Sequence, residues 1–226
     1  SYDVLYTWAG PEIAVASTKA YSTQLAVIYM IALYMADQLG TVSQGDMARY
    51  MEDLQRLPDL AEECLQDKET IQYFASQYFN AHDMYFIGRN VDYAASLEAS
   101  LKLKEISYIH SEAYTGGELK HGPISLIEDG TLVIAISTYE KLFDKMMSNV
   151  REVKARGAVV LGITVQEKEE ALKQETDYRF CVPSVTDFML PSLSILPLQL
   201  FAYYVASMKG CDIDKPRNLA KSVTVE

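Results

Sequence analysis

Carboxylates, amines and an imidazole are concentrated between residues 98 and 123 of this 226-residue chain. Glu98, Lys102 and Glu105 follow the spacing i, i+4 and i+7, which places them on one face of a helix. An acid, a base and a cation close together are what the movement of a proton along a sugar carbon skeleton requires. The spacing leaves two interpretations open. One is a solvated ion-pair ladder; the other is a general base, Glu105, whose pKa is set by Lys102 or which exchanges protons through it.

His121 lies in a Gly-Glu-Leu-Lys-His-Gly-Pro loop at residues 117–123, where Gly122 and Pro123 favour a turn. Loops on rigid scaffolds often carry chemistry, and a histidine that titrates near neutral pH can open a cyclic sugar. His82 and His110 have neighbours that suit surface or packing roles. His121 is therefore the histidine for which we expect a function.

Lys221 is the third candidate and stands in an apolar C-terminal tail, with Leu219, Ala220, Val223 and Val225 around it. A lysine in an arbitrary tail is expected to be solvated. The apolar neighbours instead favour a tail that packs against the protein. A partly desolvated amine loses proton affinity and can attack a carbonyl as a Schiff-base nucleophile.

The elements that must position these residues alternate between strands and helices from residue 83. We expect strands over 84–88, 131–136, 158–164 and 178–182, and helices over 92–109, 141–156 and 195–208. Continuous β-branched runs between helices are typical of a parallel sheet covered on both faces. Ligands of such sheets bind beyond the carboxyl ends of the strands, where residues 88–90 would lie.

The first eighty residues are predicted to be mostly helical. A short strand over 3–7 is followed by a helix from Ser17 or Thr18, one of which would be its N-cap, to about residue 39. This helix is apolar on nearly every face, so residues 1–40 resemble the end of a domain whose beginning is missing. Connecting helices are expected over 45–57, 60–65 and 70–79, with a break at Pro58.

Composition is that of a globular protein with a core, at 49% hydrophobic and 23% charged residues. A net charge of −11 argues against nucleic acid, although local lysines and helix N-termini can still bind a small anion. The apolar runs at 25–36 and 193–205 are too short or too interrupted to predict a membrane span. Three scattered cysteines and no signal peptide favour a cytoplasmic protein without a cysteine-based metal site.

Three segments of the chain carry a resemblance to a known family. They are AGPEIAVASTKA at 9–20, EASLKLKEISYIHSEAYTGGELKHGP at 98–123, and PRNLAKSVTVE at 216–226. In these the chain resembles the isomerase portion of the glutamine–fructose-6-phosphate aminotransferases. The resemblance implies an α/β fold: a three-layer, flavodoxin-like sugar isomerase (SIS) domain over 70–212, with a parallel sheet flanked by helices. It also implies a remnant of a first SIS domain over 1–42, connecting helices over 43–69 and an active-site tail over 213–226.

The resemblance further implies catalytic roles. Glu105 would transfer a proton between the first and second sugar carbons, with Lys102 assisting. His121 would open the sugar ring in the neighbouring subunit's site, which makes a homodimer necessary for activity. Lys221 would contact the open-chain sugar or form a Schiff base with it.

Binding roles are implied in the same way. Val15, Ser17 and Ala220 would line the pocket for fructose 6-phosphate or glucosamine 6-phosphate, with no metal and no organic cofactor. The family's glutaminase domain is absent from this sequence, and its serine- and threonine-rich phosphate loop would lie upstream of residue 1. We therefore expect the chain alone to be inactive or nearly so.

Two other classes of function stay open. One is a sugar-amine isomerase or deglycase built from SIS domains only. The other is a non-catalytic module that binds a sugar phosphate to regulate a partner. Glu105, His121 and Lys221 together argue against the second, because binding alone needs no proton shuttle.

Overall fold

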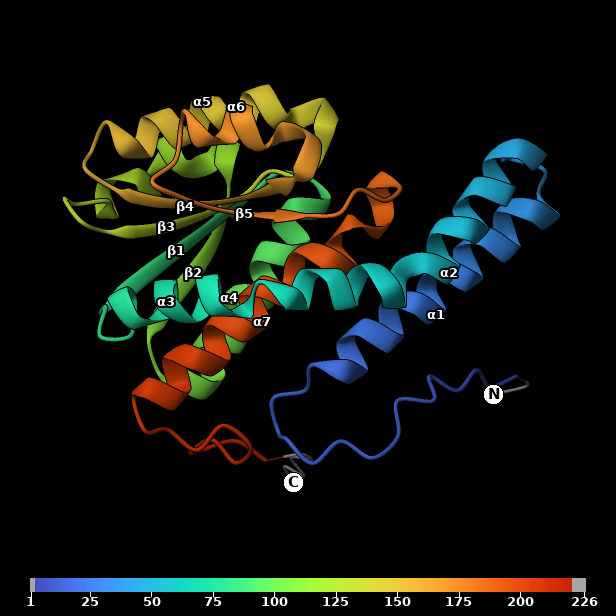
Figure 1. Cartoon of the computed structure of the whole chain (residues 1–226), viewed down its shortest axis with the longest axis horizontal. Helices are drawn as coiled ribbons and strands as arrows, with labels where there is room; N and C mark the ends of the chain where they lie inside the picture. Colours follow the sequence, from blue (N-terminus) through green and yellow to red (C-terminus); the bar gives the residue numbers. More distant parts are fainter. Residues whose placement is uncertain (1–2, 221–226) are drawn as a thin grey trace.

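A computed structural model describes residues 3–220, which form a parallel five-stranded sheet with helices on both faces and a helical arm at its side (Figure 1). The strands are β1 (Asp83–Gly88), β2 (His110–Thr115), β3 (Leu132–Ile136), β4 (Val159–Val165) and β5 (Tyr178–Val182). Their order is β2-β1-β3-β4-β5, and every neighbouring pair is parallel. This is the flavodoxin-like order, whose switch point lies between β1 and β3. The predicted α/β class and parallel sheet are confirmed.

Helices cover the sheet on two sides (Figure 1). On one side lie α3 (Lys68–Tyr78), α4 (Val91–Ser107) and α7 (Leu190–Met208), and on the other lie α5 (Phe143–Lys154) and α6 (Glu169–Lys173). The side chains of β1 contribute to the core on both faces of the sheet. Met84 and Phe86 join the core cluster on the α4 side, whereas Tyr85 and Ile87 join the cluster on the α5 side. All four side chains are buried, as expected for an inner parallel strand.

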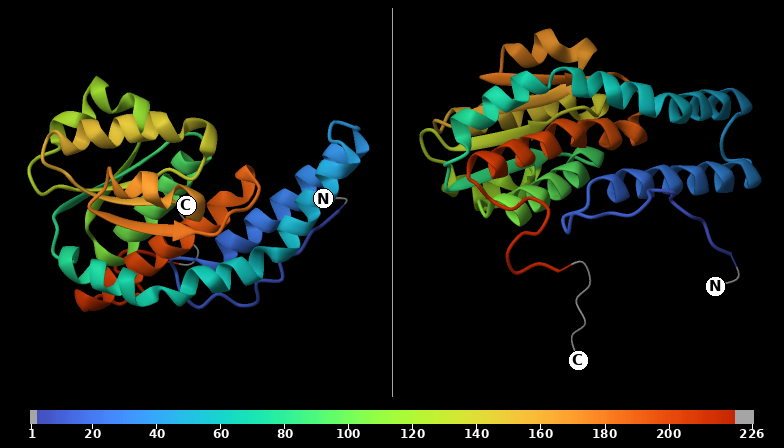
Figure 2. Two further views of the ribbon diagram at one scale, coloured as in Figure 1. Left: turned by 45° about the horizontal axis from the view of Figure 1, so that its top comes forward. Right: turned by 60° about the horizontal axis from the view of Figure 1, so that its bottom comes forward.

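The arm consists of α1 (Lys19–Gln38) and α2 (Gln44–Gln66), which lie antiparallel and project beyond the sheet (Figures 1 and 2). Tyr29 and Leu33 of α1 form a small apolar cluster with Met189 next to α7. Tyr34 of the same helix and Leu39 at its C-cap stay 67% and 70% exposed. α1 is thus apolar on more than one side, as the sequence predicts, and only one side is covered.

The residues 187–208 around α7 are long and apolar enough to cross a membrane by length and composition alone. Of the most apolar window of this segment, 61% is buried inside the protein. α7 packs against α3 and α4, so its apolarity is used here to form the core.

Several predicted elements of the first eighty residues are wrong. Residues 3–7 form no strand, and α2 continues through Pro58 instead of ending there. A proline inside a helix removes one hydrogen bond, but Leu60 and Cys64 beyond it are buried, and this burial favours an unbroken helix. Later in the chain α4 ends at Ser107, short of the predicted residue 109, and α7 begins at Leu190, ahead of the predicted residue 195.

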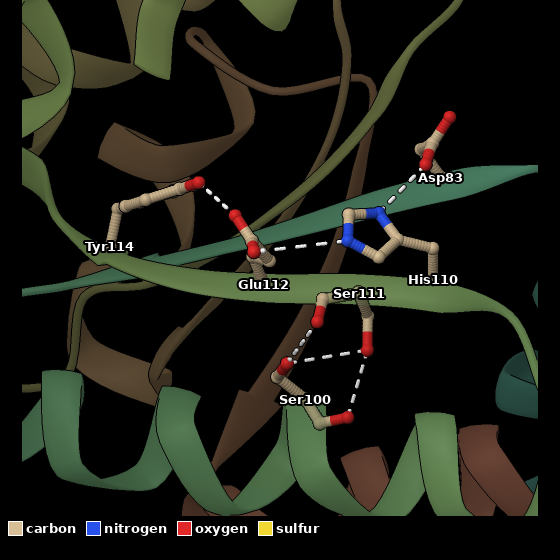
Figure 3. A network of polar contacts seen from close by, with 6 residues as sticks. All are labelled: Asp83, Ser100, His110, Ser111, Glu112 and Tyr114. Atoms are coloured by element: carbon tan, nitrogen blue, oxygen red, sulfur yellow. Dashed lines mark hydrogen bonds and ion pairs between the residues drawn. The ribbon is translucent and has the colours of Figure 1, made fainter. Parts of the chain in front are cut away.

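The edge strand β2 was not predicted, because its sequence, HSEAYT, has no apolar run. Polar contacts hold it in place (Figure 3). Ser100 of α4 and Ser111 exchange hydrogen bonds of 2.8 and 2.9 Å with each other's carbonyl oxygens. His110 lies between two carboxylates, with Nδ1 2.8 Å from Asp83 Oδ1 and Nε2 3.8 Å from Glu112 Oε1. The strand is therefore fixed by side-chain pairs that periodicity does not reveal.

Candidate active site

Lys102 lies between Glu98 and Glu105 on one face of α4. Its Nζ atom is 2.5 Å from Glu105 Oε2 and 3.6 Å from Glu98 Oε1. Only 9% of the lysine side chain is exposed, against 14% for Glu98 and 21% for Glu105. The predicted shared face is confirmed, but a solvated ladder is wrong, since these charges are largely removed from water.

Burial also determines the electrostatics of this cluster. Desolvation raises the pKa of Glu98, the nearby Lys102 ammonium opposes that rise, and the Glu105 carboxylate adds to it. Tyr21 of α1 faces the cluster: burial, with the charge of Glu98, raises the pKa of its phenol to about 12. A carboxyl group whose pKa is raised by burial beside an ammonium suits a site that must hold and deliver a proton.

The segment before α1 runs beside the tail after α7. The backbone N–H of Val15 donates to the carbonyl oxygen of Asp214 at 2.9 Å. Figure 2 shows the two segments on the same side of the molecule. Two parts of the chain predicted to line one pocket, around Val15 and after residue 212, are therefore in contact.

Ser17 is engaged in the start of α1. Its Oγ donates to Glu12 Oε2 at 2.6 Å, and the same carboxylate oxygen accepts the backbone N–H of Ala20 at 3.3 Å. Thr18 occupies the N-cap position without a side-chain capping bond. The prediction of Ser17 or Thr18 as the N-cap is thus confirmed for Thr18, although its side chain makes no capping hydrogen bond. Glu12 reaches the helix end because the chain folds back over it.

The tail beyond α7 lies on the end of α4. The backbone N–H of Arg217 donates to Tyr108 Oη at 2.8 Å, and its guanidinium carbon lies 4.1 Å from the centre of the tyrosine ring. Tyr108 follows Glu105 by three residues, at the C-cap of α4. Ala220 is exposed, and Lys221 lies outside the described residues. Neither Tyr108 nor Arg217 was predicted as a site residue.

His121 is separated from this cluster within the chain. It ends the 3-10 turn Gly116–His121, is exposed, and belongs to a turn that packs against α5. α5 and α4 lie on opposite sides of the sheet. Hence one chain brings together the α4 cluster, residues 12–18 and the tail, but it does not bring His121 to them.

A cavity of about 650 Å³ opens beyond the carboxyl ends of the strands, where ligands of this fold are expected. Asn90 after β1, Tyr139 after β3 and Thr186 after β5 line it, together with Arg49 and Tyr50 of α2. None of the residues of the Lys102 cluster lines this cavity. Lys102 and Glu105 lie in the C-terminal half of α4, away from this cavity.

The chain is similar in sequence to a known domain family and to known enzymes. Residues 77–209 match the SIS domain. The chain is 54% identical over 224 residues to the glutamine–fructose-6-phosphate aminotransferase (isomerizing) of Clostridium tetani, covering 99% of this chain and 37% of that protein. The enzyme of the same name from Thermococcus kodakarensis is 47% identical over 222 residues, which cover 98% of this chain and 36% of that protein.

Solved structures are similar over most of the chain. The C-terminal domain of glucosamine-fructose-6-phosphate aminotransferase from Francisella tularensis has a TM-score of 0.89 at 36% identity, covering 92% of this chain and 59% of that one. A glucosamine-6-phosphate deaminase from Thermotoga maritima has a TM-score of 0.64 at 26% identity, covering 94% of this chain and 58% of that one.

The chain spans little more than a third of the length of the aminotransferases that it matches. The SIS match, by contrast, covers more than half of the chain and includes the whole sheet. This chain belongs to the SIS domain family.

Proposed function

We propose that this chain is the isomerase part of an enzyme that makes glucosamine 6-phosphate from fructose 6-phosphate and glutamine. The observation that carries the proposal is the desolvated Glu98–Lys102–Glu105 cluster on a helix whose end contacts the tail, one of the two chain segments predicted to line a sugar pocket, which are themselves in contact. The names of the most similar relatives support the substrate. A buried ion cluster is costly to keep, which favours a chemical use for it.

In a ketose-to-aldose shift, a base takes a proton from carbon 1 of the open-chain sugar and returns it to carbon 2. We assign this step to Glu105, whose carboxylate already accepts a hydrogen bond from Lys102 at 2.5 Å. Lys102 orients the carboxylate before the reaction, and it stabilises negative charge that develops on the adjacent sugar oxygen.

His121 would open the sugar ring in the site of a second subunit, so the active enzyme would be a homodimer. His121 is exposed in a turn that packs against α5, which lies on the side of the sheet away from α4, and this position supports a role outside its own chain. A general acid acts only within hydrogen-bond reach of the proton that it transfers.

The sugar would lie between residues 12–18 and the tail, touching Val15, Ser17 and Ala220, with Lys221 contacting its open-chain carbonyl. The Val15–Asp214 contact supports this arrangement, since it brings the two lining segments together. Ser17 Oγ now donates to Glu12. A sugar hydroxyl that binds Ser17 would compete with that carboxylate.

The remaining parts of the proposal concern the surroundings of the chain. We assign residues 1–42 to a preceding SIS domain, 43–69 to connecting helices, 70–212 to this SIS domain and 213–226 to the active-site tail. The exposed apolar residues of α1 support a covering domain, and a glutaminase domain would complete the enzyme. We further propose a cytoplasmic location, without membrane or nucleic-acid partners.

Replacement of Glu105 by glutamine in the complete enzyme tests the assignment. Loss of a general base lowers kcat by about 10²- to 10⁴-fold. The KM for fructose 6-phosphate should change little, because the amide keeps the shape of the side chain. Glu52→Gln, on the exposed part of α2, is the matched control and should retain kcat. A Glu105→Gln enzyme with normal kcat would refute the assignment.

Calorimetric titration of this chain with glucosamine 6-phosphate and fructose 6-phosphate tests the pocket. Binding that is lost in Lys221→Ala would place the tail in the sugar site. Binding that is equal in both proteins would exclude the tail from it. We expect little or no turnover by the chain alone, because the phosphate loop that the resemblance implies lies upstream; turnover near that of the complete enzyme would contradict this.

A sugar-amine isomerase or deglycase is the second candidate, supported by the similarity to the Thermotoga maritima deaminase. The complete protein distinguishes the two. An aminotransferase consumes glutamine when it forms glucosamine 6-phosphate, whereas a deaminase releases ammonia from glucosamine 6-phosphate without glutamine.

A further inference from the structure

Tyr108 has a backbone conformation that is unusual for a large side chain. Its φ and ψ angles are 61° and 15°, in the left-handed region where glycine or asparagine is common at a helix end. Its N–H closes α4 by donating to the carbonyl oxygen of Lys104 at 3.3 Å. Glycine would satisfy this backbone without strain. The backbone conformation alone therefore does not explain a tyrosine here, and the reason must lie in the contacts of its side chain.

That side chain makes two contacts with a single residue of the tail. Its Oη accepts a hydrogen bond from the backbone N–H of Arg217 at 2.8 Å. The guanidinium carbon of the same arginine lies over the tyrosine ring, 4.1 Å from the ring centre. A planar guanidinium stacked on an aromatic face is a favourable arrangement. Arg217 is thus held both by its backbone and by its side chain.

The tail is also fixed before it reaches Arg217. Asp212 Oδ1 accepts the backbone N–H groups of Asp214 at 3.1 Å and Lys215 at 2.9 Å, which closes a turn. The carbonyl oxygen of Asp214 then accepts the N–H of Val15. After these contacts, Tyr108 is the attachment that directs the chain along the end of α4.

We propose that Tyr108 and Arg217 are positioning residues that hold the C-terminal tail on the helix carrying Lys102 and Glu105. Lys221 follows Arg217 by only four residues in the sequence, so fixing Arg217 limits the positions open to the Lys221 amine. The effect on catalysis rests on the proposed function, but attachment of the tail does not.

Hydrogen exchange of the Arg217 amide in this chain, without any sugar, tests the attachment. Tyr108→Phe removes the hydroxyl acceptor but keeps the ring, and it should speed exchange of this amide by about 5- to 10-fold, as expected for one lost hydrogen bond. Tyr34→Phe, on the exposed face of α1, is the control and should leave the amide unchanged. Unchanged exchange in Tyr108→Phe would overturn the proposal.

Kinetics of the complete enzyme test the consequence. If Tyr108 acts through the tail, Tyr108→Phe should lower kcat by about 10-fold or more, since small misplacements of reacting groups are costly. The same change should have little further effect in a Lys221→Ala background. Equal losses in both backgrounds would refute positioning through Lys221. Full activity of Glu105→Gln would instead refute the proposed function, while the exchange result would still stand.

Discussion

Replacing Lys102 by methionine tests whether the cluster on α4 is held together by charge. Methionine keeps the length and the apolar stem of the side chain but removes the ammonium that lies 2.5 Å from Glu105 and 3.6 Å from Glu98. Little of these side chains is exposed, so water cannot fully replace the lost cation. The variant leaves two largely buried carboxylates facing the same space.

The expected loss can be bounded. Removing one partner of a fully buried ion pair costs about 3–5 kcal/mol. The two carboxylates keep some contact with water, so we expect about 2–3 kcal/mol near pH 7.5, below the fully buried range. For a protein of this size each kcal/mol corresponds to about 2–4 °C, which predicts a fall in Tm of about 5–10 °C.

The pH dependence has a definite sign. Burial raises the pKa of Glu98 above its ordinary value, so the folded protein holds this proton more tightly than the unfolded chain. The stability from this group is present at low pH and is lost as pH rises through the folded-state pKa. Without Lys102 that pKa rises further, each unit being worth about 1.4 kcal/mol. The deficit of the variant should therefore grow with pH.

Urea unfolding followed by circular dichroism, near pH 5 and near pH 7.5, measures this deficit. Lys145→Met, on the exposed side of α5, is the control and should change stability by less than about 0.5 kcal/mol at either pH. If Lys102→Met lost the same stability at both pH values, altered packing would explain the loss. If it behaved like the control, the desolvation of the cluster would be refuted.

Further substitutions test the framework that carries the site. A Cβ atom on Gly88 would lie 2.5 Å from backbone atoms of Asp92, so Gly88→Ala should cost about 3 kcal/mol or more in urea unfolding. Gly45→Ala, which meets nothing closer than 4.0 Å inside α2, should instead add about 0.5–1 kcal/mol. Burial raises the pKa of Asp92 to about 6, so the stability of the wild type should fall as pH rises from about 4 to about 6. Asp92→Asn should lack this loss of stability. The explanation would be refuted if the wild type and the variant showed the same dependence of stability on pH. Gly116→Ala, whose Cβ would clash with Asn149, should cost about 1–3 kcal/mol, part of which Asn149→Ala recovers.

The sequence predicts the face of α4 but not its surroundings. The spacing of Glu98, Lys102 and Glu105 follows from helical geometry, which is local. Their burial depends on tertiary packing, which brings distant parts of the chain such as α7 onto α4 and Tyr21 of α1 near Glu98. Periodicity therefore left the solvated ladder open, although burial excludes it.

Other errors have the same origin. β2 has a polar sequence and is fixed by contacts such as the reciprocal Ser100–Ser111 bonds, so no apolar pattern marks it. Pro58 was predicted to end a helix because its local cost is known, whereas burial of the residues beyond it is a tertiary effect. Tyr108 and Arg217 are 109 positions apart, and neither residue type alone indicates a contact.

The two ends of α4 separate two possible ligand regions. At its start, Asp92 accepts the backbone N–H groups of Thr138 and Tyr139 at 2.9 and 3.0 Å, beside the cavity at the carboxyl edge of the sheet. Glu105 lies 13 positions further along, a rise of about 20 Å. A small sugar phosphate at Glu105 therefore cannot also fill that cavity, although the fold alone would place the ligand there. The tail approaches the end of α4 that carries Glu105 through its contact with Tyr108, and residues 12–18 contact the tail; both segments lie outside the sheet. Changes in these two segments should thus alter the preference for the sugar, measured as a ratio of kcat/KM values, whereas changes in the loops after β1, β3 and β5 should leave that ratio unaltered.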